Sequence, residues 1–202
     1  MKPEAIVFDI GNVLLNWDPD QLYAKLIPDP VARQAFHART GTFAMNVEID
    51  RGAPFRETVY DLAARHPADA ALIRAWHDRW IEMAAPLIDE SCAILRALRA
   101  SGVPVFALSN FGTESFAQAE IAYPVLKEFD RRFISGHMGV IKPDAAIYAA
   151  LEAETGLEGP ALFFTDDSAA NIEAAGARGW QTHVFTSSGN LAESLKSLGF
   201  VL

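Results

Sequence analysis

The sequence predicts a doubly wound α/β fold built on a parallel sheet, and three observations lead to this prediction. Short, nearly continuous apolar runs alternate with segments of helical periodicity, as expected for strands covered on both faces. The apolar runs end in polar residues, which gather at one edge of a parallel sheet. The alternation is interrupted once, by a long stretch of helical character directly after the first strand.

Five apolar runs are predicted to be strands. They cover residues 5–8, 103–108, 132–134, 161–165 and 182–185. Helices are predicted between and after them, over residues 91–100, 145–154, 169–178 and 190–198. Gly102, Gly156 and Gly179 follow the first three helices, where glycine commonly ends a helix. This order of strands and helices is typical of a parallel sheet with helices on both faces.

The interrupting stretch shows no convincing strand between Asn16 and Pro86. Helices are expected over residues 30–40, 54–65 and 68–84. A further helix is expected to start at Asp18 and Pro19, with Asp18 as N-cap and Pro19 in the first helical position. We therefore expect a helical insertion, residues 16–86, within an α/β core formed by residues 1–15 and 87–202.

Composition and charge narrow the range of partners and cellular locations that we expect for the protein. The chain has 202 residues and a formal net charge of −9, since 17 basic residues face 26 acidic ones. An acidic surface disfavours nucleic acid and anionic lipid, so we expect neither as a partner. We find no signal peptide at the start and no apolar run near the ~20 residues that span a bilayer, and so expect a cytoplasmic protein. The single cysteine, Cys92, is expected to be a buried helical residue.

Polar side chains follow three of the predicted strands and precede one helix. They are Asp9, Ser109 with Asn110, Lys142, and Asp166 with Asp167. Three carboxylates repel one another in a small site unless a cation joins them. Mg²⁺ prefers oxygen ligands and is commonly bound by one or two carboxylates together with a substrate phosphate. The set therefore predicts a Mg²⁺-dependent phosphoryl-transfer site, in which a carboxylate attacks phosphorus and water hydrolyses the aspartyl phosphate.

The same residues stand in four short motifs. They are Ile-Val-Phe-Asp-Ile-Gly-Asn-Val-Leu (residues 6–14), Phe-Ala-Leu-Ser-Asn (106–110), Lys-Pro (142–143) and Phe-Phe-Thr-Asp-Asp-Ser (163–168), the last followed by Ala-Ala-Asn-Ile (169–172). Together, in this order, they resemble the motifs of the haloacid dehalogenase (HAD) superfamily along the whole chain. The resemblance implies a Rossmann-like core, and the helical insertion matches the cap domain that this family inserts after its first motif.

The resemblance also implies roles for these residues. Asp9 would be the nucleophile and a Mg²⁺ ligand, joined by the backbone carbonyl of Gly11 and by Asp166 or Asp167, directly or through water. Ser109 and Asn110 would hold the phosphoryl oxygens, and Lys142 would orient the nucleophile and the phosphate. Gly11 and Asn12 are also expected to contact the substrate. That substrate would be a small phosphorylated metabolite, with a sugar phosphate as one candidate, since a cap excludes large substrates.

One position departs from the family pattern. Most phosphatases of the family carry a second Asp two residues after the nucleophile as general acid and base, and this chain has Gly11 there. Acid–base catalysis is typically worth about 10²–10⁴-fold in rate. The first motif resembles a bacterial subgroup related to glucose-1-phosphate phosphatases. We therefore expect the proton to come from a cap residue or from water, or to be little needed for a good leaving group.

Two alternatives remain at this stage. A metal-independent 2-haloacid dehalogenase would also lack the second Asp, although such relatives lack the Asp166-Asp167 doublet. A catalytically weak binding or regulatory protein could keep the fold without the chemistry. The retention of Asp9, Ser109 and Lys142 beside that doublet favours the phosphatase.

Overall fold

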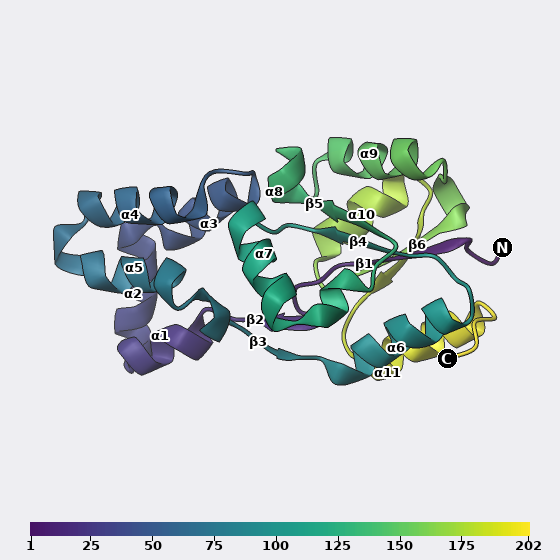
Figure 1. Cartoon of the computed structure of the whole chain (residues 1–202), viewed down its shortest axis with the longest axis horizontal. Coiled ribbons are helices and arrows are strands. Elements are labelled where there is room, and N and C mark those ends of the chain that lie inside the picture. The colour runs from purple at the N-terminus through teal and green to yellow at the C-terminus, as the bar shows by residue number, and fades with distance from the viewer.

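The computed structural model describes residues 1–202 and contains a central sheet of five parallel strands (Figure 1). The strand order is β5-β4-β1-β6-β7. The strands are β1 (Ala5–Phe8), β4 (Val105–Ser109), β5 (Arg131–Ile134), β6 (Leu162–Asp166) and β7 (Gln181–Val184). The predicted doubly wound α/β fold is confirmed, and all five predicted strands are present, with ends that match the prediction or differ by at most two residues.

Helices cover both faces of this sheet. On one face lie α6 (Asp89–Ala100) and α11 (Ser188–Ser197), and on the other α9 (Ala145–Thr155) and α10 (Ala169–Ala177). Because side chains alternate along a strand, Ile6 and Phe8 pack into the first layer while Ala5 and Val7 pack into the second. Both sets are fully buried, which explains why the strands appear as unbroken apolar runs in the sequence. Cys92 is buried on α6, as predicted.

Five helices lie together at one end of the molecule, to the left in Figure 1, and we call them the cap helices. They are α1 (Asp20–Leu26), α2 (Pro30–Thr40), α3 (Thr42–Asp50), α4 (Phe55–Arg65) and α5 (Ala70–Asp78). The helix start at Asp18 and Pro19 is confirmed: the Asp18 carboxylate accepts the Asp20 N–H at 2.8 Å, and Pro19 already has helical dihedrals.

The prediction that residues 16–86 contain no strand is wrong at both ends. The short strands β2 (Leu15–Trp17) and β3 (Ala84–Leu87) form an antiparallel pair that joins the cap helices to the sheet. They have three and four residues, and Pro86 lies in one of them, so neither shows the alternation that reveals a longer strand. Residues 68–84 also form no single helix: the 3₁₀ turns η1 (Pro67–Asp69) and η2 (Trp80–Glu82) flank α5.

Three helices were not predicted: α3, α7 (Thr113–Ala122) and the short α8 (Ser135–Met138). In α3 the apolar side chains point to two sides, since Met45 and Ile49 are buried while Phe43 and Val47 are exposed. In α7 part of the buried face is the small polar Ser115. A single apolar stripe, which is the signal for a helix in the sequence, is therefore missing. The remaining 3₁₀ turns are η3 (Pro124–Lys127) and η4 (Gly159–Ala161).

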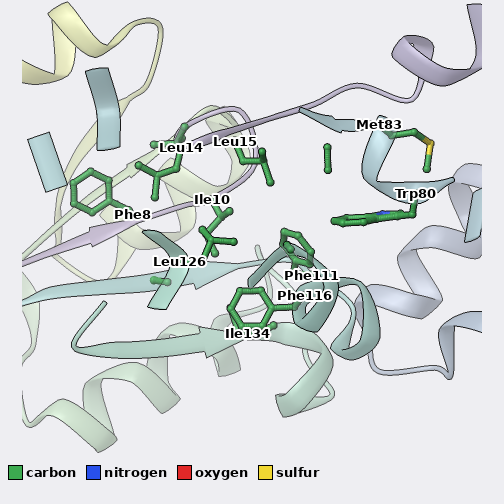
Figure 2. Packing of buried hydrophobic residues seen from close by; sticks show 14 of the residues in the cluster. Phe8, Ile10, Leu14, Leu15, Trp80, Met83, Phe111, Phe116, Leu126 and Ile134 are labelled. Carbon is green, nitrogen blue, oxygen red and sulfur yellow. The ribbon is translucent and has the colours of Figure 1, made fainter. Parts of the chain in front are cut away.

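One apolar cluster runs without a break from the sheet into the cap helices (Figure 2). It passes from Phe8 on β1 through Ile10 to Phe111, which follows β4, and reaches Trp80. The rings of Trp80 and Phe111 meet edge to face with centroids 5.5 Å apart, a favourable aromatic geometry. The shared cluster fixes where the cap helices lie over the sheet. No helix of the chain is long and apolar enough to cross a membrane.

The end of α3 lies against the backbone of the segment after β4 and the start of α8. A Cβ atom on Gly112 would fall 2.5 Å from the Ile49 side chain, and one on Gly52 would fall 2.7 Å from the Gly136 carbonyl oxygen. The Ser135 hydroxyl bridges the same parts: it donates to the Asp50 carbonyl at 2.6 Å and accepts the Phe111 N–H at 2.8 Å. Glycines thus permit a close approach that also fixes Asp50.

This junction predicts opposite effects for two alanine substitutions. In Gly136→Ala the new Cβ would lie 2.6 Å from the Thr113 backbone nitrogen and 2.8 Å from the Phe111 carbonyl oxygen. Backbone atoms cannot relieve such a clash by a side-chain rotation. We expect a loss of about 1–3 kcal/mol in the free energy of unfolding, measured by urea denaturation. The control is Gly176→Ala, in α10, where nothing lies within 4 Å and helix propensity should stabilise by about 0.5–1 kcal/mol. Equal effects of the two substitutions would contradict this view of the junction.

Candidate active site

Three neighbouring strands bring the predicted site residues together. Asp9 follows β1, Ser109 ends β4 and Asp166 ends β6, and β1 lies between the other two in the sheet. The strands are parallel, so their carboxyl ends meet at one edge, with the chain crossing to opposite sides of β1. Lys142 reaches the same point from the segment between α8 and α9.

The Lys142 ammonium is the centre of the site and is almost completely buried. Its Nζ lies 3.0 Å from Asp9 Oδ1 and 2.6 Å from Asp166 Oδ2, and it donates to the Leu108 carbonyl at 2.8 Å. These three partners match the three N–H donors of an ammonium group. Burial alone would lower the pKa of Lys142, but the two carboxylates outweigh it and raise the pKa, so the side chain stays charged.

Asp9 is held through one oxygen. Its Oδ1 accepts the Ile10 N–H at 2.6 Å and the Ser109 hydroxyl at 2.7 Å, in addition to Lys142. No protein group donates to Oδ2, which leaves that oxygen available to a ligand. Burial raises the pKa of Asp9, Lys142 lowers it and the neighbouring Asp166 raises it, so a further cation beside Asp9 would favour the carboxylate.

Asp166 is fully buried and both of its oxygens are occupied. Oδ1 accepts the Ser168 N–H at 2.8 Å, and Oδ2 accepts Lys142. The Asn171 amide donates to both oxygens at 3.0 Å. Asn171, which stands in the extension of the fourth motif but had no role assigned to it, therefore fixes the Asp166 carboxylate. This carboxylate has little capacity left for a direct ligand.

Asp167 differs from its neighbour because it is exposed. Its Oδ2 accepts the Asn12 amide at 3.0 Å, and Asn12 also accepts the Trp17 N–H at 2.9 Å. Asn12 has a left-handed backbone, with φ of 54°, a conformation that asparagine tolerates well. Gly11 lies beside these residues on the wall of the site.

The donor set fits a hard divalent cation. Asp9, Asp166 and Asp167 offer carboxylate oxygens that all lie within 4.8 Å of one another. Lys142 supplies one positive charge against the three negative charges of these carboxylates. The site as a whole therefore has two uncompensated negative charges. Oxygen ligands around an excess of negative charge match what Mg²⁺ prefers. Asp9 and Asp167 are the carboxylates with free oxygens for it.

The Asn110 side chain positions Lys142. Its side-chain amide donates to the Lys142 carbonyl at 2.9 Å and accepts the Lys142 N–H at 2.7 Å. The amide thus pairs with the backbone of Lys142 in both directions and sets the position of the ammonium group. Its side chain is committed to that backbone, and the expected contact of Asn110 with a phosphoryl oxygen stays a prediction.

A cavity of about 280 Å³ lies between this edge of the sheet and the cap helices. Asp9, Gly11, Asn12, Ser109, Asn110, Lys142 and Asp167 line its core side. Trp17 and Trp80 form an aromatic wall, with ring centroids 5.7 Å apart, and Asn46 and Asp50 of α3 face the core residues. Trp76 is fully buried among the cap helices, whereas Trp80 also lines the cavity.

A larger hollow, of about 840 Å³, lies away from these residues, near the amino-terminal ends of β4 and β5. Its three arginines are already paired with carboxylates: Arg96 with Glu128, Arg99 with Asp130 and Arg131 with Glu154. The hollow therefore offers no unpaired positive charge to an anionic ligand. The smaller cavity, with its unbalanced carboxylates, is the candidate active site.

The chain matches a known family and is similar to curated proteins. Residues 3–179 match the haloacid dehalogenase-like hydrolase family. A drimenol cyclase from Aspergillus calidoustus is 25% identical over 186 residues, which cover 90% of this chain and 34% of that protein. The chain thus spans about a third of the length of this relative.

Solved structures share the fold. A predicted HAD-like hydrolase from Porphyromonas gingivalis has a TM-score of 0.75 at 20% identity and covers 98% of both chains. A HAD-family enzyme from Bacteroides thetaiotaomicron, in complex with magnesium and inorganic phosphate, has a TM-score of 0.71 at 19% identity and covers 92% of this chain and 95% of its own. A dehalogenase has a TM-score of 0.65 at 20% identity and covers 89% and 83%.

The central ammonium gives a stability prediction. Lys142→Met leaves two buried carboxylates without their shared cation, so we expect the free energy of unfolding to fall by about 3–5 kcal/mol. Urea denaturation at pH 7 without added metal measures it. The matched control is Lys25→Met, since Lys25 is exposed and pairs with Glu82 at the surface; we expect a change within about 0.5 kcal/mol. A Lys142 effect as small as that of the control would be incompatible with a buried ion triad.

Proposed function

Because this chain belongs to the haloacid dehalogenase-like hydrolase family, we propose that it is a Mg²⁺-dependent phosphatase that cleaves small phosphate monoesters through Asp9. The observation that carries this proposal is the charge balance of the site. Three carboxylates face one ammonium in a cavity at the carboxyl ends of the strands. A divalent cation would supply the missing positive charge. A phosphoryl group is an anion that such a cation binds well.

Asp9 is the proposed nucleophile. The Ile10 N–H, Ser109 and Lys142 hold its Oδ1 in place, and Oδ2 stays free on a residue that lines the cavity. A carboxylate fixed in this way attacks without first losing rotational freedom, which is a large part of catalysis by positioning. Lys142 carries a permanent positive charge beside the same point and would stabilise negative charge on the phosphoryl oxygens.

Mg²⁺ would be held by Asp9 and Asp167, with the Gly11 carbonyl as a further ligand. Asp166 would hold Lys142 in place beside the ion. When bound, such an ion neutralises phosphoryl charge and orients the group for in-line attack. The match to a HAD-family enzyme that was crystallised with magnesium and phosphate supports this choice of cofactor. In this chain, the three clustered carboxylates favour Mg²⁺.

The size and walls of the cavity support a small metabolite as substrate. A volume of about 280 Å³ holds a phosphoryl group and a few further heavy atoms, and the cap helices close over it. Polar amides and two tryptophan rings line the part beyond the phosphoryl position. Such walls suit a compact hydroxylated body, so a sugar phosphate remains our expected substrate class, as in the glucose-1-phosphate phosphatase-like subgroup.

The first test is a metal-dependent ester assay. We expect hydrolysis of p-nitrophenyl phosphate with Mg²⁺, complete loss with EDTA, and a fall of at least about 10⁴-fold in kcat/KM for Asp9→Asn. Chloride release from a 2-haloacid without metal would instead establish the dehalogenase alternative, which the similarity to a dehalogenase structure keeps open. No turnover by the wild type on a broad panel of phosphate esters would favour a binding or regulatory protein.

The two neighbouring aspartates should differ in their effect on the metal. Asp167→Asn removes an exposed carboxylate with a free oxygen, so we expect the Mg²⁺ concentration for half-maximal activity to rise about 10–100-fold. The same substitution at Asp166 removes the main partner of Lys142, so it should chiefly lower the free energy of unfolding. Mg²⁺ titrations and urea denaturation of both variants measure this. The reverse assignment of effects would show that Asp166 is the direct ligand.

A further inference from the structure

The core side of the cavity lacks an obvious proton donor for a leaving group. Position 11 is glycine, so no side chain follows the nucleophile at that place. The Lys142 donors are all used, and the Ser109 hydroxyl donates to Asp9. Asp167 is held by Asn12 at the exposed rim. The other Asp167 oxygen is the proposed metal ligand, so none of these groups is left to carry a proton between solvent and substrate.

The cap helices bring one further titratable group to the cavity. Asp50 is the last residue of α3, and its side chain lines the cavity together with Asp9 and Gly11. It is partly buried, and the charges of Asp9 and Lys142 act on it across the cavity. Figure 1 shows α3 as the cap helix beside α7 and α8, where the cap helices meet the core.

Asp50 is held in this position by several contacts. The Asn46 amide, one helical turn earlier, donates to its Oδ2 at 2.9 Å, and the nearby Gly112 N–H favours the charged carboxylate by lowering its pKa. The Asp50 carbonyl accepts the Ser135 hydroxyl, which is tied in turn to the Phe111 N–H. A surface residue at a helix end needs no such fixing, whereas a group that must meet a substrate does.

The protonation of Asp50 suits proton transfer. Burial raises its pKa to about 7, a shift that the Gly112 N–H and Lys142 oppose and that Asp9 reinforces. A carboxyl group with a pKa near the working pH is present in both forms, so it can give a proton and take one back. The Asn46 amide, whose own oxygen accepts the Trp76 indole N–H at 3.3 Å, donates to Oδ2 and leaves Oδ1 of Asp50 to carry the proton.

We propose that Asp50, from the cap helices, is the general acid and base of the phosphatase reaction, in the role that Gly11 leaves vacant. The inference rests on the proposed phosphatase function. In the first step an Asp9 oxygen bonds to phosphorus, the bond from phosphorus to the ester oxygen breaks, and the Asp50 proton passes to that oxygen to release an alcohol. In the second step water attacks phosphorus and gives a proton to the Asp50 carboxylate. The bond from phosphorus to Asp9 breaks, and inorganic phosphate leaves.

The test compares leaving groups. The value of kcat/KM reports the steps up to release of the alcohol, so Asp50→Asn is measured with Mg²⁺ on phenyl phosphate and on 2,4-dinitrophenyl phosphate. We expect a loss of about 10²–10⁴-fold on phenyl phosphate, whose leaving group needs a proton, and less than about tenfold on the dinitrophenyl ester. Asp61→Asn, an exposed carboxylate on α4, is the control and should leave both values unchanged.

A second variant restores the proton donor from the core. The Gly11 backbone has no left-handed φ, and a Cβ there would meet nothing closer than the Trp17 Cβ at 3.9 Å, so Gly11→Asp fits without strain. Added to Asp50→Asn, it should recover at least about tenfold of the lost activity on phenyl phosphate. Recovery would support the proposal, because a purely structural defect at position 50 is not repaired from position 11.

Two results would overturn the inference. One is an equal loss on both esters in Asp50→Asn, which indicates a positioning role, and the other is no loss on either ester. Failure of the double variant to recover activity, with folding intact by circular dichroism, would also count against it. These outcomes are distinct from failure of the proposed function, in which the wild type itself hydrolyses neither ester.

Discussion

The buried Lys142 ammonium is the interaction on which the rest of the site depends. A charge away from water is tolerated only when it is paired and fully hydrogen-bonded. Here this requires Asp9 from β1, the Leu108 carbonyl from β4 and Asp166 from β6 to converge on one atom. Asn110 fixes the backbone of Lys142 and Asn171 fixes the Asp166 carboxylate. The order of strands in the sheet, with β1 between β4 and β6, is what makes this convergence possible.

The same arrangement leaves the site short of positive charge, and that shortage points to its function. Asp166 is satisfied by its protein partners, whereas Asp9 and Asp167 each keep an oxygen free. The nucleophile and the metal ligands can therefore come from the rigid sheet edge. The proton donor that we propose lies instead on a cap helix, held by close contacts at glycines. Because the nucleophile and the proposed proton donor lie on different parts of the structure, catalysis requires the cap helices to be closed over the substrate.

The sequence predicted the features that depend on local pattern and failed for those that depend on tertiary contacts. Apolar runs such as residues 5–8 identified the strands because both of their faces are buried. Asp9 and the doublet at 166–167 stood out because they follow such runs. Asp50 is the last residue of a helix with no single apolar stripe, so no local signal marked it. The partners of Asn110 and Asn171 lie 32 and 5 residues away along the chain, and only the fold reveals what these amides do.

The most direct test of the central claim is to look for the covalent intermediate on the nucleophile itself. The wild-type protein would be mixed with Mg²⁺ and a phosphate ester, quenched in acid within a single turnover, digested and analysed by mass spectrometry. A phosphoryl group on the Asp9 carboxylate, absent when EDTA replaces Mg²⁺, is the result that we predict. Ester hydrolysis at full rate with no phosphoryl group on Asp9, or with one on another residue, would contradict it.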